Sequence, residues 1–133
     1  AGWQVEGFDF ASRAVSIAKQ KMKKAGVPAN VFTDDATLMK QVTPPFDLAL
    51  DLGCFHSIEN KADYLTQLTR VLNPGGFWLI YGFLKSDPAL SGPGISTSDL
   101  ELIQRHNLTL ISRKDGFDRR ERTSAWFLWQ ANM

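Results

Sequence analysis

Residues 46–52, Phe46-Asp47-Leu48-Ala49-Leu50-Asp51-Leu52, are nearly all apolar after Asp47, which predicts a strand covered on both faces in the middle of a sheet. Two segments upstream also predict strands, and each is followed by one or two acids. Residues 3–8 predict a short strand that Asp9 closes, and residues 30–33 predict another that two acids follow. Acids at the ends of successive strands are typical of an open α/β sheet, which binds its ligands at the carboxyl ends of the strands.

Helical periodicity separates these strands. Apolar residues recur every three or four positions between Ser12 and Gly26, and lysines occupy most of the opposite side. Ser12 is a candidate N-cap, and Gly26 is a candidate C-terminal stop. Residues 61–72 predict a second helix, which Asn73-Pro74-Gly75-Gly76 ends directly before another apolar strand, residues 77–83.

The last third of the chain predicts a change of strand direction. Ser98-Asp99-Leu100-Glu101 predicts a capping box that opens a short helix to Arg105, and two strands follow at residues 108–114 and 123–130. Their connection is short and polar, which favours an antiparallel pair. The preceding stretch, residues 85–96, is the longest loop and a candidate mobile edge of a site. The expected fold class is therefore α/β, with a mostly parallel sheet and an antiparallel last strand.

Composition and charge restrict the range of functions. A chain of 133 residues with 44% hydrophobic content predicts one globular domain, residues 1–133. Its 15 basic and 14 acidic residues give a net charge of +1, which favours neither a nucleic-acid partner nor an anionic membrane. No signal peptide or membrane-spanning stretch is recognisable, so a cytoplasmic protein is expected. One cysteine and two histidines are too few for the usual four-ligand zinc site, so no metal is expected.

Carboxylates that follow the first two strands are candidate ligands of a nucleoside. One carboxylate can accept hydrogen bonds from both hydroxyls of a ribose, and Asp9 suits that role. Asp9 suits equally a structural role, because negative charge stabilises the N-terminus of the helix that follows. Asp34 or Asp35 could reach an adenine amino group, and the alternative for both is a simple turn.

The exit from the third strand carries the residues most suggestive of substrate chemistry. Gly53 lets a ligand approach the backbone closely, Phe55 offers an apolar wall, and His56 is a candidate general base. The alternative for His56 is a positional or packing role. Cys54 is interpreted as a small buried residue rather than a nucleophile, because it lies only two positions from His56 and the two side chains need not meet.

In this order and spacing, the segments resemble class I S-adenosylmethionine-dependent methyltransferases, and they are similar to the small bacterial members related to thiopurine and tellurite-resistance methyltransferases. The resemblance covers nearly the whole chain. The segments that carry it correspond to the family's second strand, third-strand end, fourth strand with its exit, the turn before the fifth strand, and the last strand: residues 5–15, 35–36, 46–56, 72–76 and 124–127.

The resemblance implies a Rossmann-like sheet, to which this chain contributes strands two to seven. The family's glycine-rich first loop has no match in the sequence, so the domain is expected to be incomplete, with its first strand and helix missing. Three explanations follow: a truncation upstream of Ala1, completion of the sheet by a homodimer or strand exchange, or a remnant that no longer binds cofactor.

The resemblance also implies a function, namely methyl transfer from S-adenosylmethionine to a small-molecule acceptor. Asp9 would bind the ribose hydroxyls, and Leu52 and Gly53 would border the methionine moiety. The remaining implied contacts are Phe10 against the adenine, Asp35 and Ala36 at its amino group, and Cys54, Phe55 and His56 facing the acceptor.

Two alternative functions remain open at this stage. A non-catalytic remnant or an oligomerisation module of the same fold would use the missing strand as a place for a partner. The second alternative is a nicotinamide-dependent oxidoreductase, because an acid after the second strand also suits the ribose of NAD.

Overall fold

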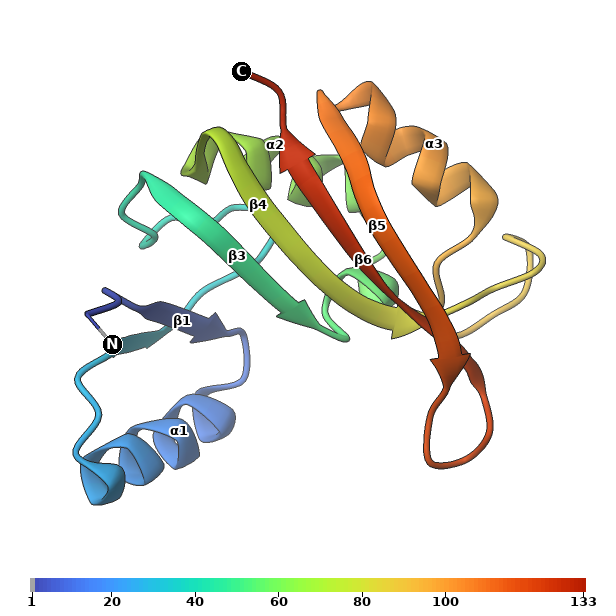
Figure 1. Cartoon of the computed structure of the whole chain (residues 1–133). Coiled ribbons are helices and arrows are strands. Elements are labelled where there is room, and N and C mark those ends of the chain that lie inside the picture. Colours follow the sequence, from blue (N-terminus) through green and yellow to red (C-terminus); the bar gives the residue numbers. More distant parts are fainter. Residues whose placement is uncertain (1) are drawn as a thin grey trace. The chain divides into compact units, whose positions relative to one another are not determined.

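The computed structural model describes residues 2–133, and the chain divides into two compact units (Figure 1). The N-terminal unit ends at Thr43, and the C-terminal unit comprises Pro44–Met133. Each unit contains one sheet, of two strands in the first and four in the second. Among the described residues, no helix has both the length and the apolar character needed to cross a membrane.

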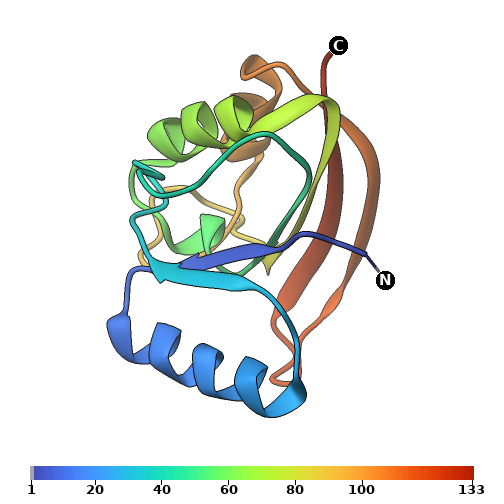
Figure 2. The same ribbon diagram turned by 90° about the vertical axis from the view of Figure 1, so that its left-hand side faces the viewer.

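The N-terminal unit is a strand-helix-strand crossover. Strands β1 (Glu6–Asp9) and β2 (Asn30–Thr33) pair in parallel, and helix α1 (Ser12–Ala25) connects them, as Figure 2 shows. The rings of Phe8 and Phe32 stack across the pair with their centroids 6.1 Å apart. The bounds of β2 confirm the prediction, whereas β1 begins three residues later than expected.

The two ends of α1 are held differently from each other. Gly26 adopts the left-handed conformation at φ 66°, and its N–H reaches the last turn of the helix, which confirms the predicted stop. The predicted N-cap, Ser12, is wrong, because Ala11 occupies that position and makes no side-chain cap. Instead the Oδ1 atom of Asp9 accepts the Ala11 N–H at 2.9 Å, so this acid holds the turn into the helix.

The C-terminal unit contains the predicted mixed sheet, in the order β3-β4-β6-β5. Strands β3 and β4 are parallel, and β6 is antiparallel to both of its neighbours, which confirms the antiparallel last strand. Helices α2 and α3 cover one face of this sheet (Figure 1). The elements of the unit, in chain order, are β3 (Phe46–Leu52), a 3-10 helix (Phe55–Ser57), α2 (Lys61–Val71), β4 (Leu72–Phe83), α3 (Thr97–Arg105), β5 (Leu108–Phe117) and β6 (Thr123–Ala131).

The core of the C-terminal unit lies between this sheet and its two helices. Alternate residues of β4 and β6 point to that side, which buries Trp78, Phe127 and Trp129 completely. Leu65 and Leu68 of α2 are equally buried. Each large apolar side chain removed from water in this way contributes about 1.5–3 kcal/mol to folding.

The position predicted for β3 is wrong. The bounds of the strand are as expected, but β3 lies at the edge of its sheet rather than in the middle. Its alternate residues Leu48, Leu50 and Leu52 are 42%, 61% and 64% exposed. The reason is that α2 and α3 cover the other face, and no described strand pairs with the outer edge of β3.

The start of α3 also differs from the prediction in detail. The cap is Ser96, whose Oγ accepts the Asp99 N–H at 3.2 Å, while the Asp99 carboxylate accepts the Ser96 N–H at 2.9 Å. Ser98, the expected cap, lies inside the helix and hydrogen-bonds the Ser96 hydroxyl. The capping box therefore exists two residues earlier than predicted, with Asp99 rather than Glu101 as its acid.

Candidate functional site

The carboxyl ends of β1 and β2 bring the predicted nucleoside ligands together. Asp9 is in register with Thr33, and the Asp34 N–H donates to the Asp9 carbonyl at 3.1 Å. The residues that follow both strands therefore lie at one edge of the two-stranded sheet. This is the edge at which parallel α/β sheets bind ligands.

The adjacent acids after β2 have different environments. Asp34 is buried, and its carboxylate accepts the N–H groups of Asp35, Lys40 and Gln41 at 2.8–3.1 Å, so it stabilises the turn. Asp35 is exposed, and its Oδ1 accepts both the hydroxyl and the N–H of Thr37. The hydroxyl hydrogen bond is the main reason why the pKa of Asp35 is lowered. Asp35, not Asp34, is therefore the acid available to a ligand.

Asp9 is available in the same way as Asp35. Its Oδ1 holds the Ala11 N–H, and within residues 2–133 no donor reaches its Oδ2. The neighbouring ring of Phe10 is 83% exposed. Each acid thus has one oxygen that holds the local turn and one that remains open to solvent, and Asp9 has an exposed aromatic ring beside it in the chain.

The exit from β3 is a tight turn built on Gly53. Its φ of +82° lies in the left-handed region, and a Cβ at this position would come within 3.2 Å of the His56 Nε2 atom. The Gly53 N–H donates to the Tyr81 carbonyl at 3.1 Å, which ties the turn to β4. Leu52 beside it is exposed, so this stretch of backbone can be approached from outside.

His56 is held as a neutral ring with a defined tautomer. Its Nδ1 accepts the Phe83 N–H at 2.9 Å, so the proton of the neutral ring is on Nε2. Burial is the main cause that lowers the pKa of His56; Lys61 and Arg122 act in the same direction, and Asp51 opposes them. The geometry therefore gives His56 a hydrogen-bond donor at Nε2, whereas a general base needs an unprotonated nitrogen there.

Two predictions about the turn after β3 are wrong. Phe55, expected to offer an apolar wall to a ligand, is fully buried and packs edge-on against Trp78 and Tyr64 with centroid distances of 5.4 and 5.5 Å. Cys54, expected to be buried, is exposed. The 3-10 helix that begins at Phe55 places this ring in the core and leaves the preceding side chain on the surface.

Asp51 stabilises this turn through its carboxylate, a role that the strand pattern did not predict. It is 5% exposed, and its carboxylate accepts the N–H groups of Cys54 and Phe55 and the hydroxyl of Tyr64. Burial raises the pKa of Asp51, although these hydrogen bonds act against the shift. The signal in the sequence is an acid near the C-terminal end of a largely apolar strand.

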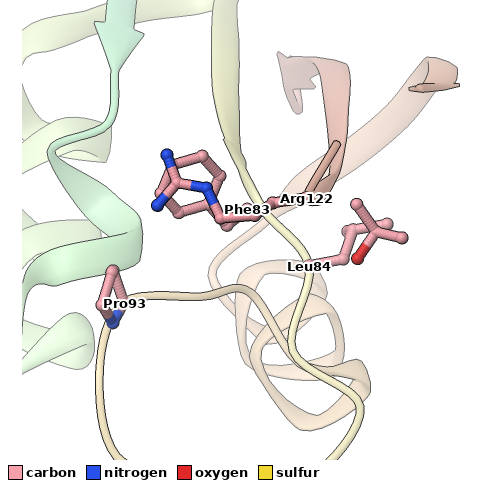
Figure 3. A pocket seen from close by; sticks show the side chains of 5 residues that line it. Phe83, Leu84, Pro93 and Arg122 are labelled. Carbon is pink, nitrogen blue, oxygen red and sulfur yellow. The ribbon is translucent and has the colours of Figure 1, made fainter. Parts of the chain in front are cut away.

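A cavity of about 390 Å³ lies at the carboxyl end of β4, lined by Phe83, Leu84, Pro93, Arg122 and Thr123 (Figure 3). Its walls come from the end of β4, the predicted loop and the start of β6. The loop was expected to border a site, but Arg122 was not singled out, because the segment from residue 115 to 122 looked like an ordinary polar connection.

Parallel strands with acids and a glycine turn at their carboxyl ends define a Rossmann-like, ligand-binding α/β protein. A family model described as a methyltransferase domain matches residues 1–76, and the chain belongs to this family. Three uncharacterized methyltransferases of Schizosaccharomyces pombe are each 36% identical over 60 residues, which are 45% of this chain and 41% of each relative. The match thus spans less than half the length of these relatives.

Solved structures confirm the fold. A methyltransferase described as S-adenosylmethionine-dependent, from Methanosarcina mazei, has a TM-score of 0.83 at 15% identity, over 99% of this chain and 84% of that one. The N-methyltransferase NodS from Bradyrhizobium japonicum, solved with S-adenosylhomocysteine, has a TM-score of 0.81 at 13% identity, over 98% and 67%. The [4+2]-cyclase SpnF scores 0.84 at 13% identity, over 98% and 66%. At these identities the likeness concerns the fold alone.

Proposed function

We propose that this protein transfers a methyl group from S-adenosylmethionine to a small-molecule acceptor. The observation that carries the proposal is the pair Asp9 and Asp35, each with one carboxylate oxygen open at the ends of neighbouring parallel strands. Membership of the methyltransferase family and the S-adenosylhomocysteine complex of NodS support the same cofactor.

The N-terminal unit suits the adenosine part of this cofactor. The open Oδ2 of Asp9 would accept the ribose hydroxyls, and the exposed ring of Phe10 would lie against the adenine. Asp35 would accept the adenine amino group, with the backbone of Ala36 beside it. Asp9 would then combine the two roles left open by the sequence, since its other oxygen holds the turn into α1.

The C-terminal unit suits the methionine moiety and the acceptor. Leu52 and Gly53 would border the methionine moiety, because the turn at Gly53 leaves room for close approach. When bound, the cofactor supplies a methyl group that is electrophilic because it is carried on a sulfonium sulfur. The residues of the chain orient the acceptor and keep water away. Cys54 and His56 would face the acceptor, with His56 donating a hydrogen bond from Nε2 rather than removing a proton.

Calorimetric titration of the full chain with S-adenosylhomocysteine and, separately, with NAD⁺ tests this proposal. We expect saturable binding of S-adenosylhomocysteine and none of NAD⁺. Asp9→Asn keeps the hydrogen bond to Ala11 but removes the charge, and should weaken binding about tenfold or more. Asp87→Asn is the matched control, since Asp87 accepts the Ala89 N–H in the same local geometry, and it should leave the affinity unchanged.

Two outcomes would contradict the proposal. Equal or tighter binding of NAD⁺ would support the oxidoreductase alternative, which the family match does not favour. Binding of neither ligand by a chain with a cooperative unfolding transition would support a non-catalytic module of the same fold.

Completion of the sheet by a second copy is a separate proposal. The outer edge of β3 pairs with no strand in the described part of the chain, and such an edge can accept a further strand. Sedimentation velocity should then show a concentration-dependent dimer. A monomer at all concentrations would contradict this proposal and leave the methyl-transfer proposal intact.

A further inference from the structure

We propose that the cavity at the carboxyl end of β4 binds an acceptor that has an apolar body and a carboxylate, and that Arg122 binds the carboxylate. The proposal rests on the proposed function in one respect, namely that the molecule bound there is the methyl acceptor. The binding site itself follows from the residues that form the cavity.

The walls of the cavity are fixed by backbone hydrogen bonds. The Leu84 N–H donates to the Thr123 carbonyl at 2.9 Å, and the Ile95 N–H donates to the Phe83 carbonyl at 2.7 Å. Phe83, Leu84 and Pro93 supply the apolar part of the lining, and Arg122 is its charged group. A volume of about 390 Å³ lies in the range of small-molecule sites, which are mostly apolar with a few polar groups.

Arg122 is oriented before any ligand arrives. Its Cζ lies 4.0 Å from the centre of the Phe83 ring, and Figure 3 shows the guanidinium lying across that ring. Its Nε and Nη2 atoms both donate to the Asp118 Oδ2 atom, at 2.7 and 2.6 Å. No acceptor within residues 2–133 reaches Nη1, so this edge of the guanidinium can donate to a ligand.

Asp118 is itself held in place, so it fixes the position of the Arg122 guanidinium. The Oδ1 atom of Asp118 accepts the N–H groups of Arg120 and Arg122, both at 2.9 Å, so this carboxylate is engaged by donors at both oxygens. Burial tends to raise the pKa of Asp118, but these hydrogen bonds and the Arg122 side chain lower it overall, and the group is ionised at neutral pH. Guanidinium groups bind carboxylates through paired hydrogen bonds, which a neutral amide cannot match.

The cavity lies close to the turn after β3. The His56 ring packs against Phe83 with a centroid distance of 4.8 Å, and the His56 carbonyl accepts the Gly94 N–H at 2.9 Å. Phe83 is therefore in contact with Arg122 and with His56. An acceptor anchored by its carboxylate at Arg122 would have its apolar body against Leu84 and Pro93.

Calorimetric titration with benzoate and with benzamide, in the presence of S-adenosylhomocysteine, tests this inference. The two probes have the same shape and differ in charge. We expect benzoate to bind about tenfold or more tightly than benzamide. Arg122→Gln should remove this preference without changing the affinity for S-adenosylhomocysteine. Arg120→Gln, on the same connection between β5 and β6, is the matched control and should retain the preference for benzoate.

The results separate the inference from the function on which it rests. Equal affinity for both probes in the unmodified protein, or a loss as large in Arg120→Gln as in Arg122→Gln, would overturn the carboxylate site. A preference for benzoate that depends on Arg122, in a chain that does not bind S-adenosylhomocysteine, would support the site and contradict methyl transfer. Comparing the probes on the unmodified protein keeps the test decisive even if Arg122→Gln disturbs the local fold.

Discussion

The Nδ1 atom of His56 faces a backbone donor, whereas the Nδ1 atom of His106 faces a backbone acceptor. The Nδ1 atom of His56 accepts the Phe83 N–H, whereas the Nδ1 atom of His106 lies 2.9 Å from the Leu102 carbonyl and must donate to it. The two histidines should therefore carry opposite tautomers, with the proton on Nε2 in His56 and on Nδ1 in His106. Nitrogen-15 NMR of the imidazole rings at neutral pH measures this directly.

The titration of His56 follows from the same contacts. Its pKa should lie below 6.5, because burial disfavours the charged ring. The stabilising effect of His56 is then present above pH 6.5 and is lost as the pH falls through the lowered pKa. A titration midpoint above 6.5, or a proton on Nδ1 of His56, would contradict this account and restore the general-base role.

The pKa of Asp51 should be shifted in the opposite direction to that of His56, namely upward. Burial raises its pKa above 3.8, so its contribution to stability is fully present below pH 3.8 and is lost as the pH rises through the raised value. Tyr64→Phe removes a hydrogen bond that lowers this pKa, and should raise it further. Carbon-13 NMR of the Asp51 carboxyl group measures both values. A midpoint at or below 3.8, or a lower one in Tyr64→Phe, would show that the carboxylate is not shaped by these contacts.

At the scale of elements, the first part of β4 depends on the absence of a side chain at Gly76. A Cβ there would lie 2.9 Å from the Asn73 carbonyl oxygen and 3.2–3.3 Å from those of Asp47 and Phe46, all of which are backbone atoms. Gly76→Ala should therefore destabilise the protein by about 1–3 kcal/mol, measured by urea unfolding.

Gly116→Ala is the matched control for this substitution. A Cβ at Gly116 would meet no atom within 4 Å, and the residue lies in a strand, where alanine is accepted. We expect its stability to stay within about 0.5 kcal/mol of the unmodified protein. Equal losses in the two variants would mean that the start of β4 has room for a side chain at Gly76.

Several elements could be predicted from the sequence, and the errors have local causes. The bounds of β2 and β3 and the antiparallel pairing of β5 with β6 follow from apolar runs bounded by turn residues. The caps of α1 and α3 were assigned one and two residues too late. At α1 the alanine before Ser12 holds the cap position without a side-chain bond, and at α3 both Ser96 and Ser98 could serve as the cap. Choosing among them requires the backbone geometry, which the sequence pattern does not contain.

At the scale of the whole molecule, periodicity predicts which residues share a face but not what covers it. Leu48, Leu50 and Leu52 alternate along β3 as a buried face would, yet they are exposed because α2 and α3 lie on the other side. The same distinction holds for the candidate site, where some residues could be predicted from the sequence and others could not. Asp9, Asp35 and Gly53 follow from their positions at strand ends, whereas the burial of Phe55 and the orientation of Arg122 depend on contacts between distant segments.

The proposed function depends on the binding of S-adenosylmethionine. Proton–nitrogen correlation spectra recorded while S-adenosylhomocysteine is added test it most directly. We expect saturable shifts of the amide signals of Asp9, Phe10, Ala36 and Gly53, the residues proposed to contact the cofactor. The signals of Arg119 and Arg120 should stay in place. Spectra that do not change at any ligand concentration, or that change only outside these residues, would contradict the account.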